Sequence, residues 1–359
     1  MANRSHSRKL IIQLTPPETR NPYYTMLAPE LERHGFDTRY TTDYARALTW
    51  IAGASGPSIV HVHQVDGLYP SGDRVDARNG ARALVNFLIR ARARGAAVIH
   101  TLHNRRPHDS SLLDVYSYAE RMAGALATRI VVHGTPAELY ARQVAASGKI
   151  RILPHPSFAG FYGPLVEQAE ARARLALQPD EYVILSLGDL KPYKGHELIL
   201  DGFERASLPR SRLVVAGGSP PSDKYVSVIE DRARAIGLDR VRIVAATIPE
   251  EMVPIWLSAA DLAVYGFEEI LMSGSMMLSL SYGLPAVVPD LGCLSEYVID
   301  GKNGYLYRSG NALSLSSAFV RAHEDRLDRE SVMSSMLAYA PDNVAAGLAD
   351  IFDDALGLL

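Results

Sequence analysis

The sequence predicts an α/β protein built from two doubly wound, mostly parallel sheets. Three observations lead to this prediction. Short apolar runs alternate with helical patterns along the chain, as expected where each strand is followed by a helix that crosses back over the sheet. The alternation breaks around residues 150–163, a stretch rich in proline and glycine that we interpret as a linker. Each half then begins with its own buried strand, which leads into a loop of polar residues.

Five strands and two helices are expected before the linker. Strands are predicted where runs of Ile, Val and Leu lie between turn residues, and helices where apolar side chains recur every three or four positions. The strands fall at residues 9–14, 36–40, 58–63, 97–102 and 128–132, and the helices at residues 26–34 and 81–94.

The same pattern resumes beyond the linker. Strands are predicted at residues 182–187, 212–216, 240–244, 261–265 and 287–288, and helices at residues 196–206, 222–236, 249–258 and 276–282. A last helix, residues 341–359, follows the second half in sequence but need not pack on it. The expected domains are therefore residues 1–155 and 156–340.

Composition indicates a globular protein and argues against several classes of function. Of the 359 residues, 47% are hydrophobic and 21% charged, and the formal net charge of −3 gives no basic field that would favour nucleic acid. The single cysteine, Cys293, leaves no pair for a disulfide or a zinc site. A reducing cytoplasm is the expected compartment. No apolar run is long enough for a signal-peptide core or a membrane span.

A loop with two lysines follows the first strand of the second half. Lys191 and Lys194 lie between Gly188 and Gly195 in the segment GDLKPYKG. Two ammonium groups at the carboxyl end of a parallel sheet are well placed to neutralise a diphosphate. The alternative is a solvated turn, because lysine is usually exposed.

A small-residue turn, Ser273-Gly274-Ser275, precedes the apolar helix predicted at residues 276–282. The first N–H groups of a helix have no partner within it, and with the helix dipole they favour an anion such as phosphate. The alternative is a core helix capped by Ser273 or Ser275 for packing alone. If the strands run parallel, this turn and the lysine loop lie at the same edge of the sheet. No GxGxxG follows the first strand and no GxxxxGK[ST] occurs, so NAD-type and P-loop sites are not favoured.

Polar residues also gather after the strand predicted at residues 97–102. His103 and Asn104 follow it directly, and His108 and Asp109 come next. An imidazole at this edge could bind a sugar hydroxyl or act as a base, and Asp109 is a second candidate base.

Other polar and aromatic residues of the first half leave alternatives open. Asn21 lies in the loop after the first strand, followed by Tyr23 and Tyr24, which could stack on a sugar or simply cover the first helix. His61 and His63 face the same side of one strand. With no third ligand at a telling spacing, we interpret them as structural and predict no zinc bound by the protein.

Several segments resemble a known family. They are GDLKPYKG, AADLAVYGFEEILMSGSMMLSLSYGLPAVVP and GCLSEYVIDGKNGYLY, with weaker similarity in NPYYTMLAPELERHGFD and VIHTLHNRRPHD. Together they resemble the GT-B-fold nucleotide-sugar glycosyltransferases, close to the family 4 group, along nearly the whole chain. The fold implied is two Rossmann-like domains facing a cleft. The last helix resembles the one that crosses back to cap the N-terminal domain in that family.

The resemblance assigns donor-binding roles to residues of the second half. Lys191 and Lys194 resemble the residues that bind the phosphates of the sugar donor. Ser273, Gly274 and Ser275 resemble those whose backbone N–H groups bind the distal phosphate and the sugar. Thr247 and Ile248 fall where the family holds the nucleobase. In the first half, His103 falls where the family has a histidine near the donor sugar.

The chain departs from the family at one motif. The common pattern has two glutamates, and the second binds the ribose hydroxyls; in this chain their positions hold Ile270 and Leu278. Glu269 is one residue out of register and is retained as a candidate donor ligand. The segment ILMSG resembles a subgroup with an ILxSG turn, found among exopolysaccharide and lipid-linked-sugar transferases and including inverting mannosyltransferases.

The expected function is transfer of a sugar from a UDP- or GDP-sugar to an acceptor hydroxyl, in polysaccharide or glycoconjugate biosynthesis. No cofactor and no metal ion are expected. The acceptor, a sugar, a lipid-linked sugar or a small molecule, is expected to contact four residues: Asn21, Tyr23, Asn104 and His108. The alternatives are a sugar-nucleotide epimerase or hydrolase on the same fold, and a non-catalytic nucleotide-sugar binding protein.

Contact with a membrane is the remaining question about partners. The helix predicted at residues 81–94 carries Arg82, Arg90, Arg92 and Arg94. They could touch anionic lipid headgroups, or they could form an ordinary solvated face. The expected location is therefore the cytoplasm, with peripheral contact at the inner face of the membrane left open.

Overall fold

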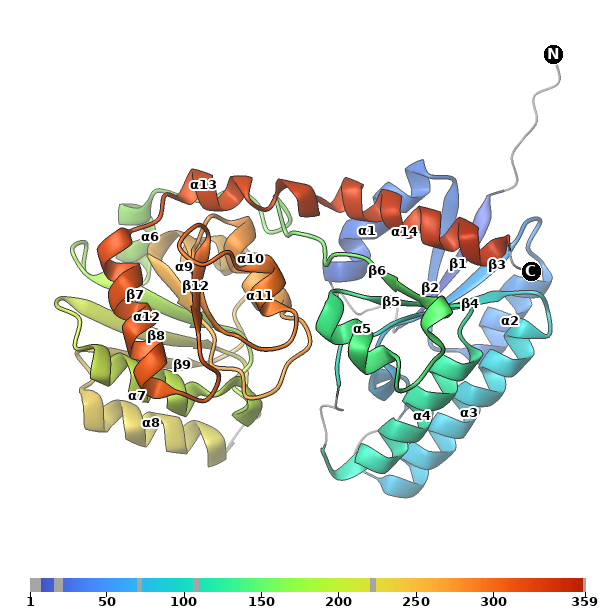
Figure 1. Ribbon diagram of the computed structural model, residues 1–359, viewed down its shortest axis with the longest axis horizontal. Coiled ribbons are helices and arrows are strands. Elements are labelled where there is room, and N and C mark those ends of the chain that lie inside the picture. The colour runs from blue at the N-terminus through green and yellow to red at the C-terminus, as the bar shows by residue number, and fades with distance from the viewer. Residues whose placement is uncertain (1–7, 16–21, 70–72, 106–109, 220–223, 358–359) are drawn as a thin grey trace, which may run out of the picture. The chain divides into compact units, whose positions relative to one another are not determined.

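The chain forms two compact units, each with its own sheet (Figure 1). The computed structural model describes residues 8–15, 22–69, 73–105, 110–219 and 224–357. One unit comprises Met1–Pro156 with Pro341–Leu359, and the other Ser157–Ala340. Each contains a six-stranded sheet in which neighbouring strands are parallel. The predicted fold class, two doubly wound parallel sheets, is confirmed.

The first unit has the strand order β2-β1-β3-β4-β5-β6. Its strands are β1 (Lys9–Leu14), β2 (Phe36–Thr41), β3 (Ser58–Val62), β4 (Ala97–Thr101), β5 (Arg129–Val132) and β6 (Ile150–Ile152). Every residue of β3, β4 and β5 is buried, because helices cover both faces of the sheet. Burial on two faces explains why these strands appear in the sequence as continuous apolar runs rather than alternating ones.

Two groups of helices cover this sheet (Figure 1). They are α1 (Pro22–Arg33) and α14 (Pro341–Leu356) on one face, and α2 (Tyr44–Ala52), α3 (Arg74–Arg92) and α4 (Leu113–Leu126) on the other, with α5 (Thr135–Ala141) between β5 and β6. Helix α14 packs on α1 and on β3 and β4, and Leu348 and Phe352 enter the same core as Ile59 and Ile99. Among the described residues, no helix has both the length and the apolar character needed to cross a membrane.

The second unit has the strand order β12-β11-β10-β7-β8-β9. Its strands are β7 (Tyr182–Leu187), β8 (Ser211–Gly217), β9 (Val241–Ala245), β10 (Leu262–Val264), β11 (Ala286–Pro289) and β12 (Gly304–Tyr307). Its helices are α6 (Gln168–Arg174), α7 (His196–Ala206), α8 (Lys224–Ile236), α9 (Val253–Ala259), α10 (Gly274–Ser281), α11 (Leu294–Tyr297), α12 (Ala312–Asp325) and α13 (Arg329–Ser334). Helices α7, α8 and α12 share one core with the strands, which contains Phe203 and Phe319.

Each sheet reverses its winding direction beside its first strand. In the first unit β1 lies between β2 and β3, and in the second β7 lies between β8 and β10. The loops that leave the carboxyl ends of two such strands turn to opposite faces and open a crevice, where doubly wound proteins bind ligands. A ligand-binding site is therefore expected at the loops after β7 and β10.

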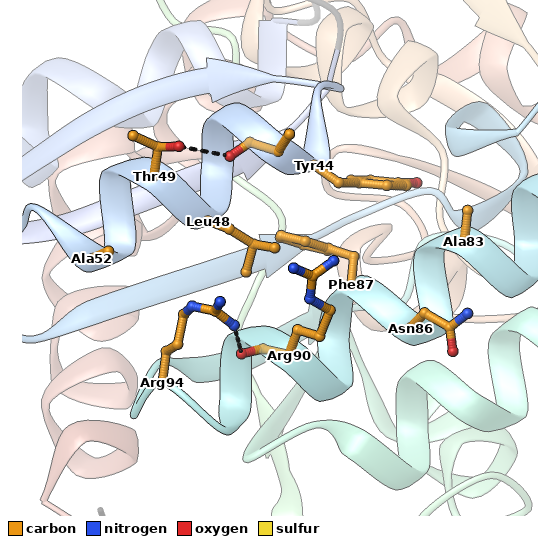
Figure 2. Close-up of a pocket in the computed structure, with 10 residues that line it drawn as sticks. Tyr44, Leu48, Thr49, Ala52, Ala83, Asn86, Phe87, Arg90 and Arg94 are labelled. Atoms are coloured by element: carbon orange, nitrogen blue, oxygen red, sulfur yellow. Dashed lines mark hydrogen bonds between the residues drawn. The ribbon is translucent and has the colours of Figure 1, made fainter.

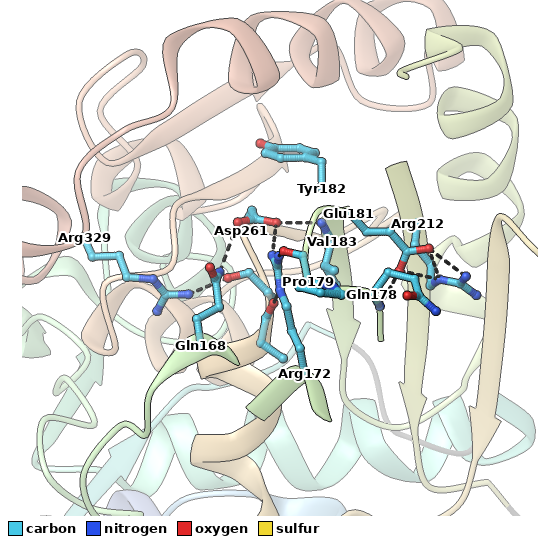
Figure 3. Close-up of polar contacts among 12 residues, drawn as sticks. Gln168, Arg172, Gln178, Pro179, Glu181, Tyr182, Val183, Arg212, Asp261 and Arg329 are labelled. Atoms are coloured by element: carbon cyan, nitrogen blue, oxygen red, sulfur yellow. Dashed lines mark hydrogen bonds and ion pairs between the residues drawn. The ribbon is translucent and has the colours of Figure 1, made fainter. Parts of the chain in front are cut away.

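A polar network fastens the opposite, amino-terminal edge of the second sheet (Figure 3). Asp261, just before β10, accepts hydrogen bonds from the backbone N–H of Val183 at 2.7 Å and from the guanidinium of Arg172 at 2.7 Å. Arg329 donates to the carbonyl of Leu257 at 2.9 Å. Buried charges need such partners, so the network fixes helices α6 and α13 to the sheet far from the crevice.

Several element boundaries differ from the sequence prediction. Ile150–Ile152, assigned to the linker, forms β6 and pairs with β5; the strand is short, contains Arg151 and is followed closely by prolines. Helix α3 begins seven residues before the predicted start, where Asp73 caps it by accepting from the N–H groups of Val75 and Asp76. Helices α2 and α4 and strand β12 were not predicted. Their apolar patterns are too short or too mixed to stand out.

Candidate active site

The lysine loop between β7 and α7 is held by backbone hydrogen bonds to β8. The N–H of Gly188 donates to the carbonyl of Ala216 at 3.0 Å, and that of Leu190 to Gly218 at 2.7 Å. Gly188 has φ of +133°, a region that side chains disfavour. The loop therefore leaves the strand at a sharp, fixed angle.

Gly195 closes this loop against the segment that follows β10. It adopts the left-handed conformation with φ of +63°, and a Cβ atom there would lie 2.1 Å from the carbonyl oxygen of Gly266. The N–H of Glu268 also donates to the carbonyl of Tyr193 at 3.0 Å. Only glycine permits so close an approach of two backbones. The loops after β7 and β10, the two strands at the winding reversal, are thus packed together.

The ammonium group of Lys194 and the hydroxyl of Ser275 meet over Gly188. A Cβ placed on Gly188 would lie 2.7 Å from Nζ of Lys194 and 3.1 Å from Oγ of Ser275. Residues 194 and 275 are far apart in sequence, yet they border the same small space. The structure therefore brings together the two features predicted to bind phosphate.

Lys194 is half-buried, and its environment changes its proton affinity. The pKa of Lys194 is lowered to about 8, mainly by burial; the carboxylate of Asp189 opposes the shift and the positive charge of Lys191 adds to it. Lys191 is more open, with Nζ 3.8 Å from Asp189. An ammonium group without a close counter-ion in a partly desolvated position interacts strongly with an added anion.

The amino terminus of α10 supplies backbone donors at the same place. Ser273 is the N-cap, and its side chain accepts a hydrogen bond from the N–H of Met276 at 3.1 Å. Ser273 therefore caps the helix as predicted, and its hydroxyl oxygen is engaged in this bond. Gly274 and Ser275 occupy the first two helical positions, whose N–H groups have no partner within a helix. The helix is almost wholly buried beyond Ser275, so these two groups lie at the end of a rigid element.

The other predicted donor ligands lie on neighbouring loops of the same sheet. A Cβ on Gly218 would lie 3.2 Å from Oγ1 of Thr247 and 3.4 Å from Oδ1 of Asp189, which places Thr247 beside the lysine loop. Ile248 follows it and is half-buried. Glu269 is also half-buried, on the segment between β10 and α10.

In the first unit, part of the predicted site lies outside the described residues. Asn21, His108 and Asp109 belong to that part. His103 and Asn104 follow β4 as predicted, and the carbonyl of Asn104 accepts a hydrogen bond from the hydroxyl of Tyr116 at 2.9 Å. Both residues are half-buried.

Sequence reasoning missed a cluster of four histidines at this edge. His63, His103, His133 and His155 follow β3, β4, β5 and β6, and we call them the histidine arc. Their ring centroids lie 5.3, 5.0, 5.6 and 5.3 Å, respectively, from the ring of Tyr23. Tyr23 is 4% exposed, so its ring is packed among these side chains. The available signal was the recurrence of histidine one to three residues after successive strands.

The histidine arc is held in its neutral form. Burial lowers the pKa of His133 to about 4 and that of His155 to about 3, and the neighbouring His133 adds to the shift of His155. Burial and the other histidines also hold the pKa values of His63 and His103 well below the usual range. Within the described residues, no group of three or more His, Cys, Asp or Glu side chains is arranged to hold a metal ion.

A groove of about 620 Å³ lies between α2 and α3 on the first unit (Figure 2). Tyr44 stacks on Phe87 at 4.8 Å, and Arg90 and Arg94 line one end. The aliphatic floor is already covered, since Leu48 is 8% and Phe87 2% exposed. The exposed lining of the groove is mostly apolar, and Arg90 and Arg94 add positive charge at one end.

Solved structures with the same architecture define the class of fold. Sucrose-phosphate synthase from Thermosynechococcus elongatus superposes with a TM-score of 0.77 at 18% identity, covering 98% of this chain and all of that one. Anabaena HepE in complex with UDP gives 0.73 at 14% identity, covering 97% and 100%. The two doubly wound sheets are therefore those of the GT-B glycosyltransferase fold.

Sequence comparison places the second unit more narrowly. Residues 167–335 match the family model of the glycosyl transferases group 1. A D-inositol 3-phosphate glycosyltransferase from Streptosporangium roseum is 26% identical over 74% of this chain and 66% of its own length. A GDP-mannose:glycolipid 4-beta-D-mannosyltransferase from Xanthomonas campestris pv. campestris is 24% identical over 64% and 61%. The chain thus spans less than two thirds of the length of each relative.

Proposed function

We propose that this protein is a glycosyltransferase that moves a sugar from a UDP- or GDP-sugar to an acceptor hydroxyl without a metal ion. The observation that carries the proposal is the meeting of Lys194 Nζ and Ser275 Oγ over Gly188, at the amino terminus of α10. An ammonium group and two N–H groups without partners in the helix make a binding site for a diphosphate.

The same groups would promote the reaction. As the glycosidic bond breaks, the departing nucleoside diphosphate gains negative charge. Lys194, Lys191 and the N–H groups of Gly274 and Ser275 would stabilise that charge, an effect that is larger in a partly desolvated site than in water. Because the pKa of Lys194 is lowered to about 8, an anion bound beside it would raise that pKa again and keep the ammonium charged.

The acceptor hydroxyl would be handled by the first unit. If the reaction inverts the anomeric centre, a base such as His103 or Asp109 would take the proton from the acceptor. If it retains the configuration, no protein base is strictly required. The relatives include an inositol-phosphate glycosyltransferase and a GDP-mannose-dependent enzyme, and a solved structure of the same fold contains UDP. The proposal therefore includes UDP and GDP donors and sugar, lipid-linked and small-molecule acceptors.

A donor screen followed by product analysis tests the proposal. The melting temperature of the chain should rise with one of the UDP-, GDP-, ADP- or dTDP-sugars, because a ligand at one hundred times its Kd stabilises the folded state by about 2.7 kcal/mol. Incubation with that donor and a set of acceptors should give a glycosylated product. A new sugar nucleotide or free sugar from donor alone would instead identify an epimerase or hydrolase. Donor binding without turnover for any acceptor would identify a binding protein.

Enlarging Gly274 is expected to separate binding of the sugar from binding of the nucleotide. A Cβ there would meet no heavy atom closer than 3.7 Å, so Gly274→Val can fold while projecting methyl groups beside the first N–H groups of α10. We expect calorimetry to show weaker binding of the nucleotide sugar and nearly unchanged binding of the free nucleoside diphosphate. Because valine keeps the backbone N–H that would bind the phosphate, equal losses for both ligands would mean that the sugar does not lie beside residue 274.

We also propose electrostatic contact between α3 and anionic lipid headgroups. Arg90 and Arg94 line the groove of Figure 2 and are exposed. Binding to vesicles containing phosphatidylglycerol should therefore be lost at high salt and weakened by Arg90→Gln with Arg94→Gln. Exposed Arg234, on α8 of the other unit, provides the control variant, Arg234→Gln. Salt-independent binding, or equal binding by all variants, would contradict this contact.

A further inference from the structure

A chain of hydrogen bonds links Gln13, His63 and His103 at the carboxyl edge of the first sheet. Nε2 of His63 lies 2.9 Å from Oε1 of Gln13, and Nδ1 of His63 lies 3.1 Å from Nε2 of His103. The two imidazole rings are within 20° of parallel, with centroids 5.4 Å apart. This separation fits an in-plane bond between ring nitrogens rather than stacked rings. Gln13 and His63 are 3% and 2% exposed, so water does not compete for these bonds.

The chain determines where each proton lies. A carbonyl oxygen can only accept a hydrogen bond, so Oε1 of Gln13 requires a proton on Nε2 of His63. A neutral His63 then has no proton on Nδ1, which must accept from Nε2–H of His103. A neutral His103 in turn carries no proton on Nδ1. No hydrogen bond from the described residues reaches that last nitrogen, which is therefore an open acceptor.

We propose that His63 is a positioning residue that holds the proton of His103 on Nε2 and so presents Nδ1 of His103 as the acceptor for a substrate hydroxyl. This inference rests on the proposed function, because it assigns His103 a hydroxyl-bearing sugar substrate. It goes beyond it by giving a role to His63 and Gln13, which are buried away from the ligand. An acceptor nitrogen can accept the hydrogen bond of a hydroxyl or take its proton, whereas a nitrogen that carries hydrogen can only donate to the hydroxyl oxygen.

The surroundings keep both rings neutral, as the proton assignment requires. His61, His100, His133 and His155 face His103 or His63 from the neighbouring strands, and each would repel added positive charge. The buried carboxylate of Glu120 is bonded to Nε2 of His100 at 2.7 Å. His133 and His155 donate from Nδ1 to the carbonyls of Leu153 and Pro156 at 3.0 and 2.8 Å. Their protons are thus fixed by the backbone and do not compete for His63.

Nitrogen NMR of the full chain, labelled with ¹⁵N at its 11 histidines, tests the proposal without any substrate. The signals of His103 are assigned by their loss in His103→Gln. At pH 7.5 the expected spectrum shows protonated Nε2 and unprotonated Nδ1 for both His63 and His103. Protonated Nδ1 in His103, or an even mixture of the two forms, would overturn the proposal. This result stands whether or not the chain transfers sugars.

Replacing Gln13 by glutamate should move the proton of His103 from Nε2 to Nδ1. A carboxylate beside Nε2 would favour the doubly protonated form of His63, which donates from Nδ1 and forces the proton of His103 onto Nδ1. In Gln13→Glu we expect this altered spectrum, unchanged nucleotide binding, and a kcat lower by about 10- to 100-fold, as for outer partners of other functional histidines. His61→Gln, equally buried but bonded to Thr101, should leave the His103 signals unchanged.

The two variants separate a positioning role from a structural one. A charged His63 in Gln13→Glu with an unaltered His103 spectrum would overturn the proposal. If Gln13→Glu fails to fold, the wild-type spectrum alone decides. A wild-type chain with the expected protons but no transfer to any acceptor would contradict the proposed function and leave the proton assignment intact.

Discussion

Lowering the pH from 7.5 to 5 is expected to reduce the free energy of unfolding of the first unit by roughly 5 kcal/mol, mostly through its buried histidines. Burial lowers the pKa of His61 and His155 to about 3 and that of His133 to about 4. In the unfolded chain these groups bind protons near pH 6.5. Their contribution to stability is therefore complete above pH 6.5 and is lost as the pH falls towards 4. His100 opposes the trend, because Glu120 raises its pKa.

The fluorescence of Trp50 can report this unit alone. The chain has two tryptophans, Trp50 on α2 and Trp256 in the second unit, and Trp256→Phe removes the second. Urea unfolding at pH 7.5, 6.5, 5.5 and 5 should show the loss. In His133→Asn the free energy of unfolding should depend less steeply on pH, by up to one proton. The asparagine amide can still donate to the carbonyl of Leu153, so the variant keeps that hydrogen bond. His34→Gln, at an exposed position, should leave the slope unchanged. A pH-independent free energy would mean that the histidines are not buried in neutral form.

Replacing Gly195 by alanine is expected to destabilise the second unit by about 3 kcal/mol more than the same change at Gly310. Both glycines have positive φ, +63° and +71°, so both variants incur the same kind of backbone strain. Only at Gly195 would the new Cβ collide with a carbonyl oxygen, that of Gly266 at 2.1 Å, whereas at Gly310 it meets nothing within 4 Å. The difference isolates the contact between the loops after β7 and β10.

Urea unfolding followed by Trp256, in a Trp50→Phe background, measures this difference. Nucleotide affinity should also fall in Gly195→Ala, because separating the two loops moves Lys194 away from Ser275. Gly310→Ala should retain the affinity. Equal destabilisation by the two variants would show that the loops are not packed as described, and the proposed diphosphate site would lose its support.

The grouping of the proposed donor-binding residues was largely predictable, because these residues lie in short, distinctive segments. YVILSL is an uninterrupted apolar run, and the glycines of GDLKPYKG mark the loop that follows. The meeting of Lys194 and Ser275 was predictable only on the assumption that their strands are parallel and close together. That proximity depends on β10 pairing with β7, which no local pattern encodes.

The arrangement of the proposed acceptor side was less predictable, since it comes from packing across strands. Each member of the histidine arc is a single histidine after a different strand, and a single histidine is ambiguous in a sequence. His63 was interpreted as structural, and its bond to His103 appears only when β3 and β4 lie side by side. Strand β6, which carries His155 into the arc, was hidden in a proline-rich segment that resembles a linker.

Titration of the nucleoside diphosphate into wild-type protein and into Lys194→Ala tests the central claim most directly. Loss of a hydrogen bond to a charged group costs about 1.5–3 kcal/mol, so we predict a Kd about 10- to 150-fold higher for Lys194→Ala at pH 7. The exposed Lys302→Ala should match the wild type. Wild-type affinity should also decline above pH 8, where Lys194 loses its proton, and this decline should be absent from Lys194→Ala. Equal affinity of wild type and Lys194→Ala would contradict the account.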